Sequence, residues 1–95
     1  MFELTGFQRD LLYVIAGLDG PKGLAIKDEL ELVYGKEIDH GQLYPNLNTL
    51  VEKGLVMKEP IDGRANSYSL TDHGYREIDI RQKWEQKYLD DSQPS

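Results

Sequence analysis

Apolar side chains recur every third or fourth residue through the first part of the chain, which is the spacing of one helix face. Thr5 and Gln8 stand three residues apart at its start, as in a capping box. Residues 19–23 contain two glycines and a proline, which end a helix and favour a turn. The pattern predicts a first helix that buries Leu4, Phe7, Leu11, Val14, Ile15 and Leu18.

Two further helices are predicted after that turn. The second covers residues 25–34 and ends at a glycine cap, and its inward side holds Ile26, Leu30 and Val33. The third covers residues 40–53 and begins where Asp39 and Gln42 repeat the capping-box spacing. Its buried face comprises Leu43, Leu47, Leu50 and Val51.

The pattern then changes to two short strands, residues 55–61 and 66–70, separated by the hairpin signal Asp62-Gly63. Thr71 or Asp72 is expected to cap a last helix, which runs to about Leu89. This order predicts an α+β, mainly α fold, the winged helix-turn-helix, with three helices and a two-stranded wing. We expect a DNA-binding domain over residues 1–71, followed by a dimerisation helix and short tail over residues 72–95.

Pro45 lies inside the third predicted helix, where it lacks an amide hydrogen and its ring clashes with the carbonyl of Gly41. Two interpretations stay open at this point. Either the first turn is bent, so that early amides are free to contact a phosphate, or Pro45 marks a later helix start.

The polar side of this helix consists of neutral hydrogen-bonding groups, which read base edges and bind phosphate oxygens. A merely solvated face in so acidic a chain would carry Asp and Glu, but none occurs between Asp39 and Glu52. We therefore interpret residues 40–53 as a helix that contacts the bases and phosphates of DNA. Its candidate contacts are His40, Gln42, Tyr44, Pro45, Asn46, Asn48, Thr49 and Lys53.

Three segments resemble the PadR family of winged-helix transcriptional regulators. They are QLYPNL at 42–47, LVEKGLV at 50–56 and YSLTDHG at 68–74, and the resemblance covers about residues 8–80. The resemblance implies a homodimeric DNA-binding regulator, a repressor by expectation. In such a regulator Tyr44 would hold a phosphate and the helix over residues 40–53 would enter the major groove of DNA. The chain departs from the family pattern in two respects: its wing tip carries only Arg64 where Arg and Lys usually abound, and only one helix follows the wing.

The wing, residues 56–70, is expected to touch the DNA backbone or the minor groove. Arg64 follows the turn, where it binds a phosphate or enters a groove, unless it is a solvated turn residue. Asn66 is a candidate contact on the second strand, whereas Tyr68 is expected in the core. Lys22 and Lys27 flank the second helix and are further candidates, although exposed lysines are common.

The last helix carries two apolar stripes on opposite sides. Tyr75, Ile78 and Leu89 are expected to pack on the domain's own core. The other stripe is predicted to pair two subunits, as a single small domain has little chain left to cover it. The predicted dimer-interface residues are Ile80, Trp84 and Tyr88, widened by Phe2 and Tyr13.

Composition narrows the function further. The 95 residues carry 11 basic and 17 acidic groups, a net charge of −6, which disfavours nonspecific DNA affinity and suits a protein that works at high salt. A winged-helix module that binds protein and not DNA is the alternative. With neither a signal-peptide pattern nor a bilayer-length apolar run, we expect a cytoplasmic protein without membrane contact.

Catalysis and metal binding are not predicted. The chain has no cysteine, and its histidines, His40 and His73, give no third ligand for a zinc site. No cofactor is expected, and the sequence leaves any small-molecule effector unspecified. The predicted partners are a second copy of the chain and double-stranded DNA with a palindromic operator.

Overall fold

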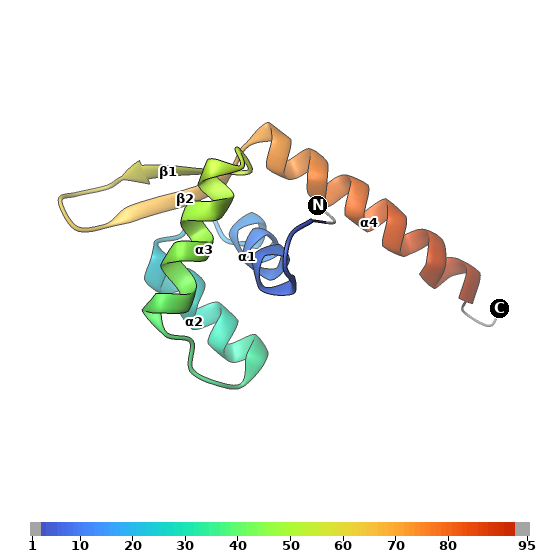
Figure 1. The fold of residues 1–95 in the computed structure, drawn as a ribbon, viewed down its shortest axis with the longest axis horizontal. Helices are drawn as coiled ribbons and strands as arrows, with labels where there is room; N and C mark the ends of the chain where they lie inside the picture. Colours follow the sequence, from blue (N-terminus) through green and yellow to red (C-terminus); the bar gives the residue numbers. More distant parts are fainter. Residues whose placement is uncertain (1–2, 93–95) are drawn as a thin grey trace.

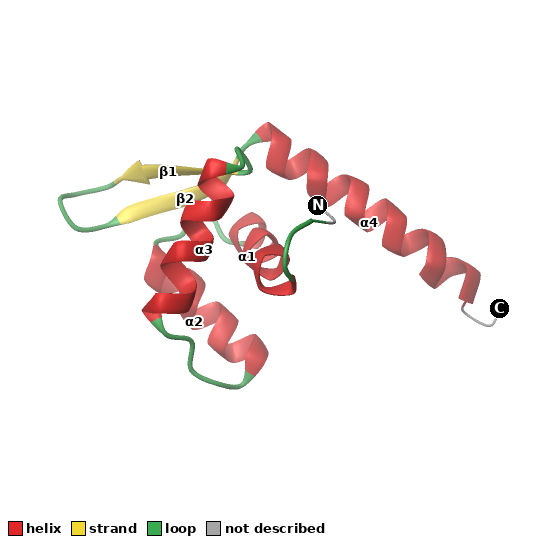
Figure 2. Cartoon of the chain, viewed as in Figure 1, coloured by secondary structure: helices red, strands yellow, loops and turns green. Residues whose placement is uncertain are grey.

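The structure is a computed structural model and describes residues 3–92, with side chains described up to residue 90. Its elements run α1 (Gly6–Gly17), α2 (Gly23–Tyr34), α3 (His40–Glu52), β1 (Val56–Pro60), β2 (Asn66–Leu70) and α4 (Asp72–Ser92). The order confirms the predicted winged helix-turn-helix. Figure 1 shows the hairpin and α4 leaving the three-helix body in opposite directions along an axis of 53 Å, and Figure 2 shows how little of the fold is strand.

Helix α1 lies at the centre, in contact with α2, α3, α4 and β2. Its capping box forms as predicted, with Gln8 N–H donating to Thr5 Oγ1 at 3.1 Å and Thr5 N–H donating to Gln8 Oε1 at 3.2 Å. The single buried stripe was an incomplete prediction, because Leu12 is also fully buried. Several elements surround α1, so it buries more than one face.

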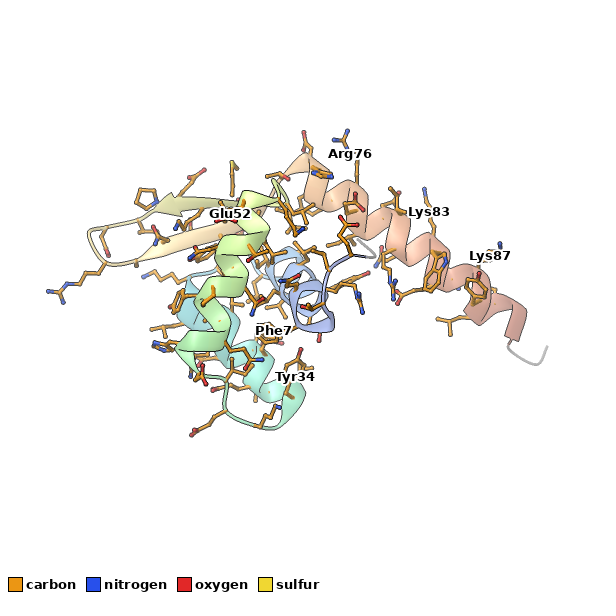
Figure 3. The ribbon with its side chains drawn as sticks, viewed as in Figure 1. Phe7, Tyr34, Glu52, Arg76, Lys83 and Lys87 are labelled. Carbon is orange, nitrogen blue, oxygen red and sulfur yellow. The ribbon has the colours of Figure 1, made fainter. Side chains whose placement is uncertain are left out.

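Helix α2 packs on α1 through Ile26 and Leu30, and Gly35 ends it in the left-handed conformation, as predicted. The inward position of Val33 was wrong: this side chain is 66% exposed. The buried face is centred nearer Leu30 and Tyr34, which leaves Val33 at its edge. The ring of Tyr34 lies 6.2 Å from that of Phe7 (Figure 3).

A polar contact also joins these two helices. The Tyr34 hydroxyl donates a short hydrogen bond to the Asp10 carboxylate. Burial, and then this carboxylate, raise the pKa of Tyr34 to about 12. The Tyr34 hydroxyl is therefore protonated at neutral pH, as a hydrogen-bond donor must be.

The bounds of α3 decide whether Pro45 marks a later helix start. The helix begins at His40, one turn before the proline, with Asp39 as its cap; Asp39 Oδ1 accepts from Gln42 N–H at 2.8 Å. The later helix start is therefore excluded. Pro45 has no amide hydrogen to give to Gly41, so that carbonyl lacks its helical partner. Leu43, Leu47 and Leu50 are fully buried, and Val51 is partly buried.

The wing is the predicted antiparallel hairpin, with Val56 opposite Leu70 and Pro60 opposite Asn66. The first strand is shorter than the predicted residues 55–61. A further backbone contact ties the hairpin to the segment before α2: Lys22 bridges Ser67, and Tyr68 N–H donates to the Pro21 carbonyl at 2.9 Å. The wing is thereby held beside the start of α2.

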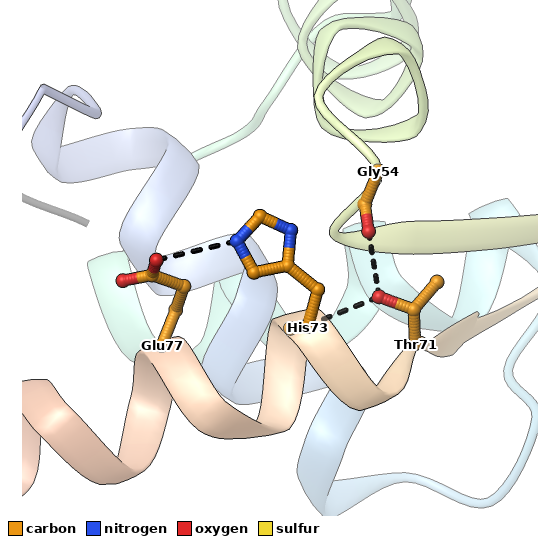
Figure 4. A network of polar contacts seen from close by, with 5 residues as sticks. Gly54, Thr71, His73 and Glu77 are labelled. Atoms are coloured by element: carbon orange, nitrogen blue, oxygen red, sulfur yellow. Dashed lines mark hydrogen bonds and ion pairs between the residues drawn. The ribbon is translucent and has the colours of Figure 1, made fainter.

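Contacts of Thr71 and Gly74 with Gly54 and Leu55 connect the end of α3 to β1 and α4, and we call these four residues the joint (Figure 4). Thr71 Oγ1 donates to the Gly54 carbonyl at 2.6 Å and accepts from Gly74 N–H at 3.0 Å, so Thr71 is the cap of α4. Thr71 N–H donates to the Leu55 carbonyl at 3.1 Å. Gly54 has a φ of 75°, a conformation that glycine adopts without strain.

Beyond this joint, α4 departs from the prediction. Ile78 is buried, but Tyr75 and Leu89 are 54% and 53% exposed, so they do not pack on the core as expected. The side of α4 turned to the body holds Gly74 and Ile78, and the C-terminal turns of the helix extend past the three-helix body (Figure 1). Within residues 3–92 none of the helices combines the length and apolar character of a bilayer-spanning segment.

A substitution at Gly74 tests how much the close packing of α4 on the Leu55 carbonyl contributes to stability. A Cβ at this position would lie 2.3 Å from the Leu55 carbonyl oxygen, a backbone atom that cannot rotate away. We expect Gly74→Ala to lower the free energy of unfolding by about 1–3 kcal/mol, the usual cost of overpacking. Urea denaturation followed by circular dichroism measures it. Gly17→Ala is the control, because its Cβ meets nothing within 4 Å, and equal stability of the two variants would contradict the assignment.

Candidate nucleic-acid interface

The outer face of α3 is polar and small. At about 100° per residue, the positions opposite the buried leucines are Gly41, Pro45, Asn48 and Glu52, and all four are exposed. Gly41 and Pro45 carry little side chain, so the helix backbone can approach a partner closely there. The Asn48 amide extends from this face without a hydrogen bond inside the described part of the chain.

The two flanks of α3 differ. On one flank His40 and Tyr44 pack ring to ring at 5.5 Å, edge to face, toward the start of α2. The other flank carries Gln42, Asn46, Thr49 and Lys53, of which Gln42 and Lys53 are exposed. Helix α3 thus has an aromatic edge on one side of its outer face and an amide-rich edge on the other.

Four of the predicted contacts meet in one surface hollow. Tyr44 from α3, Lys22 at the start of α2, and Arg64 and Asn66 from the wing all line it. Their positions in the sequence are far apart, and the bridge between Lys22 and Ser67 brings them together. The hollow combines two cationic side chains with a phenol and an amide, a donor set that suits a phosphodiester.

The turn of the wing is shaped by Asp62. Its Oδ1 accepts the backbone N–H groups of Arg64 at 2.9 Å and Ala65 at 3.0 Å, an Asx-type turn. These two bonds, followed by the nearby Lys22 ammonium, hold the pKa of the Asp62 carboxyl below its usual value. The charged carboxylate fixes the backbone around Arg64, while the guanidinium itself remains exposed.

The structure does not place every predicted contact on this surface. Both polar atoms of the Asn46 side-chain amide already form hydrogen bonds within the protein. Its Oδ1 accepts from Gln8 Nε2 at 2.9 Å, and its Nδ2 donates to the Gln42 carbonyl at 2.7 Å. Thr49 donates its hydroxyl proton to the Pro45 carbonyl at 3.0 Å. Lys27 lies apart from the hollow, paired with Glu31 at 3.0 Å, and that carboxylate raises its pKa.

Three residues near the hollow were missed or assigned otherwise. Tyr68 belongs to the core as predicted, with 3% exposure, yet it also lines the hollow, and burial raises the pKa of its hydroxyl. Lys58 lies opposite Tyr68 in the hairpin and shares its face, which the alternation of the strands could have revealed. Gly23 also lines the hollow, a position without a signal in the sequence pattern.

The predicted dimer-interface residues are placed as follows. Ile80 and Tyr88 are each 54% exposed and Trp84 is 42% exposed, all on the projecting part of α4. Tyr13 is partly buried beside α4, where burial and then Glu85 raise its pKa. Phe2 lies outside the described residues. Across residues 3–92 there is no cluster of three or more residues of metal-ligand type.

Comparison with known proteins identifies the family. The model of the transcriptional regulator PadR-like family matches residues 11–80, which include α2, α3 and the whole wing. The chain belongs to this family. Membership makes this PadR-like protein a DNA-binding transcriptional regulator and not an enzyme.

Solved structures support the same architecture. RosR of Halobacterium salinarum, a halophilic archaeon, matches in a complex structure at 46% identity over 92% of this chain and 77% of that one, with a TM-score of 0.88. MarR matches at 28% identity over 92% and 61% of the two chains, with a TM-score of 0.69.

FabT of Streptococcus pneumoniae, solved in complex with DNA, matches at 16% identity over 98% and 64% of the chains, with a TM-score of 0.75; it shows the fold alone. No curated protein matches.

Replacing the two asparagines of α3, Asn46 and Asn48, should have different effects on the stability of the protein. Asn46→Ala removes two hydrogen bonds that tie α3 to α1 and to its own first turn, so we expect the free energy of unfolding to fall by about 1–2 kcal/mol. Asn48→Ala should change it by less than about 0.5 kcal/mol, because Asn48 is exposed. Urea denaturation measures both. Equal stabilities would show that the Gln8–Asn46 bond contributes nothing.

Proposed function

We propose that this PadR-like protein is a homodimeric repressor that reads a palindromic operator with α3 and touches the adjacent backbone with its wing. The observation that carries the proposal is the hollow beside α3. Lys22, Tyr44, Arg64 and Asn66 converge there from three elements, at the edge of a helix face with no acidic side chain before Glu52. A repressor needs only to occupy its operator, so repression is the simplest outcome.

The outer face of α3 suits a major groove. A groove about 12 Å wide admits a helix whose exposed side is narrow, and Gly41 and Pro45 keep it narrow. Asn48 is placed to read a base, since an asparagine amide pairs in bidentate fashion with adenine. We assign His40, Gln42 and Lys53 to flanking contacts, and Asn46 and Thr49 to holding the helix in shape.

The hollow suits a phosphate of the same duplex. Lys22 and Arg64 supply charge, while the Tyr44 hydroxyl and the Asn66 amide supply directed hydrogen bonds. Such contacts fix the register of the protein on DNA without reading sequence. Lys58 on β1, opposite Tyr68, would extend this basic surface toward the adjacent DNA backbone.

The projecting part of α4 suits a second copy of the chain. Trp84 and Tyr88 pack edge to face at 5.2 Å, and Arg81 lies 4.5 Å over the indole, so a preformed aromatic surface remains partly exposed. A two-fold axis would bury this surface against itself, with Ile80 within it and Tyr13 at its edge. Two α3 helices would then lie about 34 Å apart, one turn of DNA.

Selection from a random duplex library tests the function directly. We expect enrichment of a palindromic site whose half-sites are one turn apart, and weaker binding to it as salt rises. Work on cellular DNA also implies a cytoplasmic location. Failure to enrich any sequence, together with no binding to duplex DNA at low salt, would favour the protein-binding alternative.

Trp84→Ala tests the dimer. Truncating a central aromatic costs about 2 kcal/mol or more, so the dimer dissociation constant should rise roughly thirty-fold while the exposed side chain leaves folding intact. Sedimentation equilibrium over a range of protein concentrations measures it. Gln82→Ala, another exposed residue of α4, is the control. A Trp84→Ala dimer as tight as the Gln82→Ala dimer would place the interface elsewhere.

A further inference from the structure

Gly23 is the first residue of α2 and is buried against the ring of Tyr44. A Cβ at this position would lie 2.7 Å from the Tyr44 hydroxyl oxygen, 2.9 Å from Cε1 and 3.1 Å from Cζ. Real Cβ atoms essentially never approach heavy atoms closer than 3.0 Å. The outer edge of the ring therefore rests on backbone that only glycine leaves uncovered.

Backbone conformation does not explain this glycine. The glycines with positive φ are Gly20, Gly35 and Gly54 among the described residues, and Gly23 is not one of them. Gly6 makes a useful comparison, because it also begins a helix and its Cβ would meet nothing closer than an Arg9 nitrogen at 3.9 Å. Space for the tyrosine, and not backbone freedom, sets the requirement at Gly23.

The contact determines where the Tyr44 hydroxyl lies. The ring is confined by Gly23 on one side and by His40 on another, at 5.5 Å between centroids. Tyr68 also lines the hollow. The hydroxyl is thus held against Gly23 at the wall of the hollow, which Lys22 also lines, and a group that enters between α2 and the wing can reach it.

We propose that Gly23 is a positioning residue for DNA binding, whose missing side chain sets the Tyr44 hydroxyl where it donates a hydrogen bond to a DNA phosphate. The proposal rests on the proposed function and adds a residue that itself touches no DNA. The ring is held before binding, so the contact costs no rotamer entropy when DNA arrives.

The consequence of adding a methyl group follows from the mobility of the clashing atoms. Tyr44 is only partly buried and faces a hollow, so its ring can swing outward when a Cβ is added at Gly23. Gly74 differs, because there the clash is with backbone. Gly23→Ala should therefore fold, with its hydroxyl displaced from the phosphate.

The experiment compares Gly23→Ala with the control Gly6→Ala on the selected operator duplex, by fluorescence anisotropy. We expect Gly23→Ala to bind about ten-fold more weakly, the size of one charge-assisted hydrogen bond, and Gly6→Ala to bind as the wild type does. The loss should be equal at every salt concentration, because a neutral hydroxyl releases no counterion. A reduced salt slope would instead show that Lys22 had moved, and would overturn the assignment.

Tyr44→Phe supplies the second arm. It should weaken binding about as much as Gly23→Ala, and the double variant should be weaker than Tyr44→Phe by no more than about two-fold, since the hydroxyl is already lost. Full additivity of the two losses would show that Gly23 acts on something other than Tyr44.

A third measurement uses the wild type and therefore does not depend on any variant. It looks for nuclear Overhauser contacts between the Gly23 Hα protons and the Tyr44 ring. Their presence both free and bound to DNA is expected, and their loss on binding would overturn the proposal. A wild type that binds no DNA contradicts the proposed function, whereas a wild type that binds and a Gly23→Ala variant of equal affinity contradict only the role of Gly23.

Discussion

The burial of three leucines on α3 is the constraint on which the rest of the structure depends. Leu43, Leu47 and Leu50 are all fully buried, and the helix that carries them contacts α1 on one side and β1 beyond. So small a domain cannot lose this packing and stay folded, so the rotation of α3 about its own axis is fixed. The polar face is thereby turned outward, and the Gln8–Asn46 hydrogen bond keeps the helix from sliding.

The wing and α4, which project from the three-helix body, are also held firmly to it. The wing is tied to the start of α2 by the Lys22–Ser67 bridge, and α4 is tied to the end of α3 by Thr71 and by the close contact of Gly74 with the Leu55 carbonyl. The α4 surface that we propose pairs two chains is thus connected by packed backbone to the surface that we propose binds DNA. In a dimer, the geometry of pairing would set the distance between the two recognition helices.

Much of this could be predicted from the sequence, because helix caps, hairpin turns and apolar periodicity are local signals. The Thr5–Gln8 box, the Asp39 cap and the strand at 66–70 formed as expected. The failures arise where tertiary packing decides: Leu12 is buried because α1 is central, Val33 lies at the edge of a face, and Leu89 projects past the body. The hollow could not be foreseen, since the Lys22–Ser67 bridge and the Gly23–Tyr44 contact join residues distant in sequence.

We propose that DNA binds to the outer face of α3 and to the hollow beside it. Amide chemical-shift mapping, with the selected duplex titrated into the isotope-labelled protein, tests it most directly. The largest shifts are expected in residues 40–49, around Lys22 and Gly23, and across the wing turn at 62–66, with little change in residues 82–90. Shifts that gather on α4 and leave α3 and the wing unchanged at saturation would contradict it.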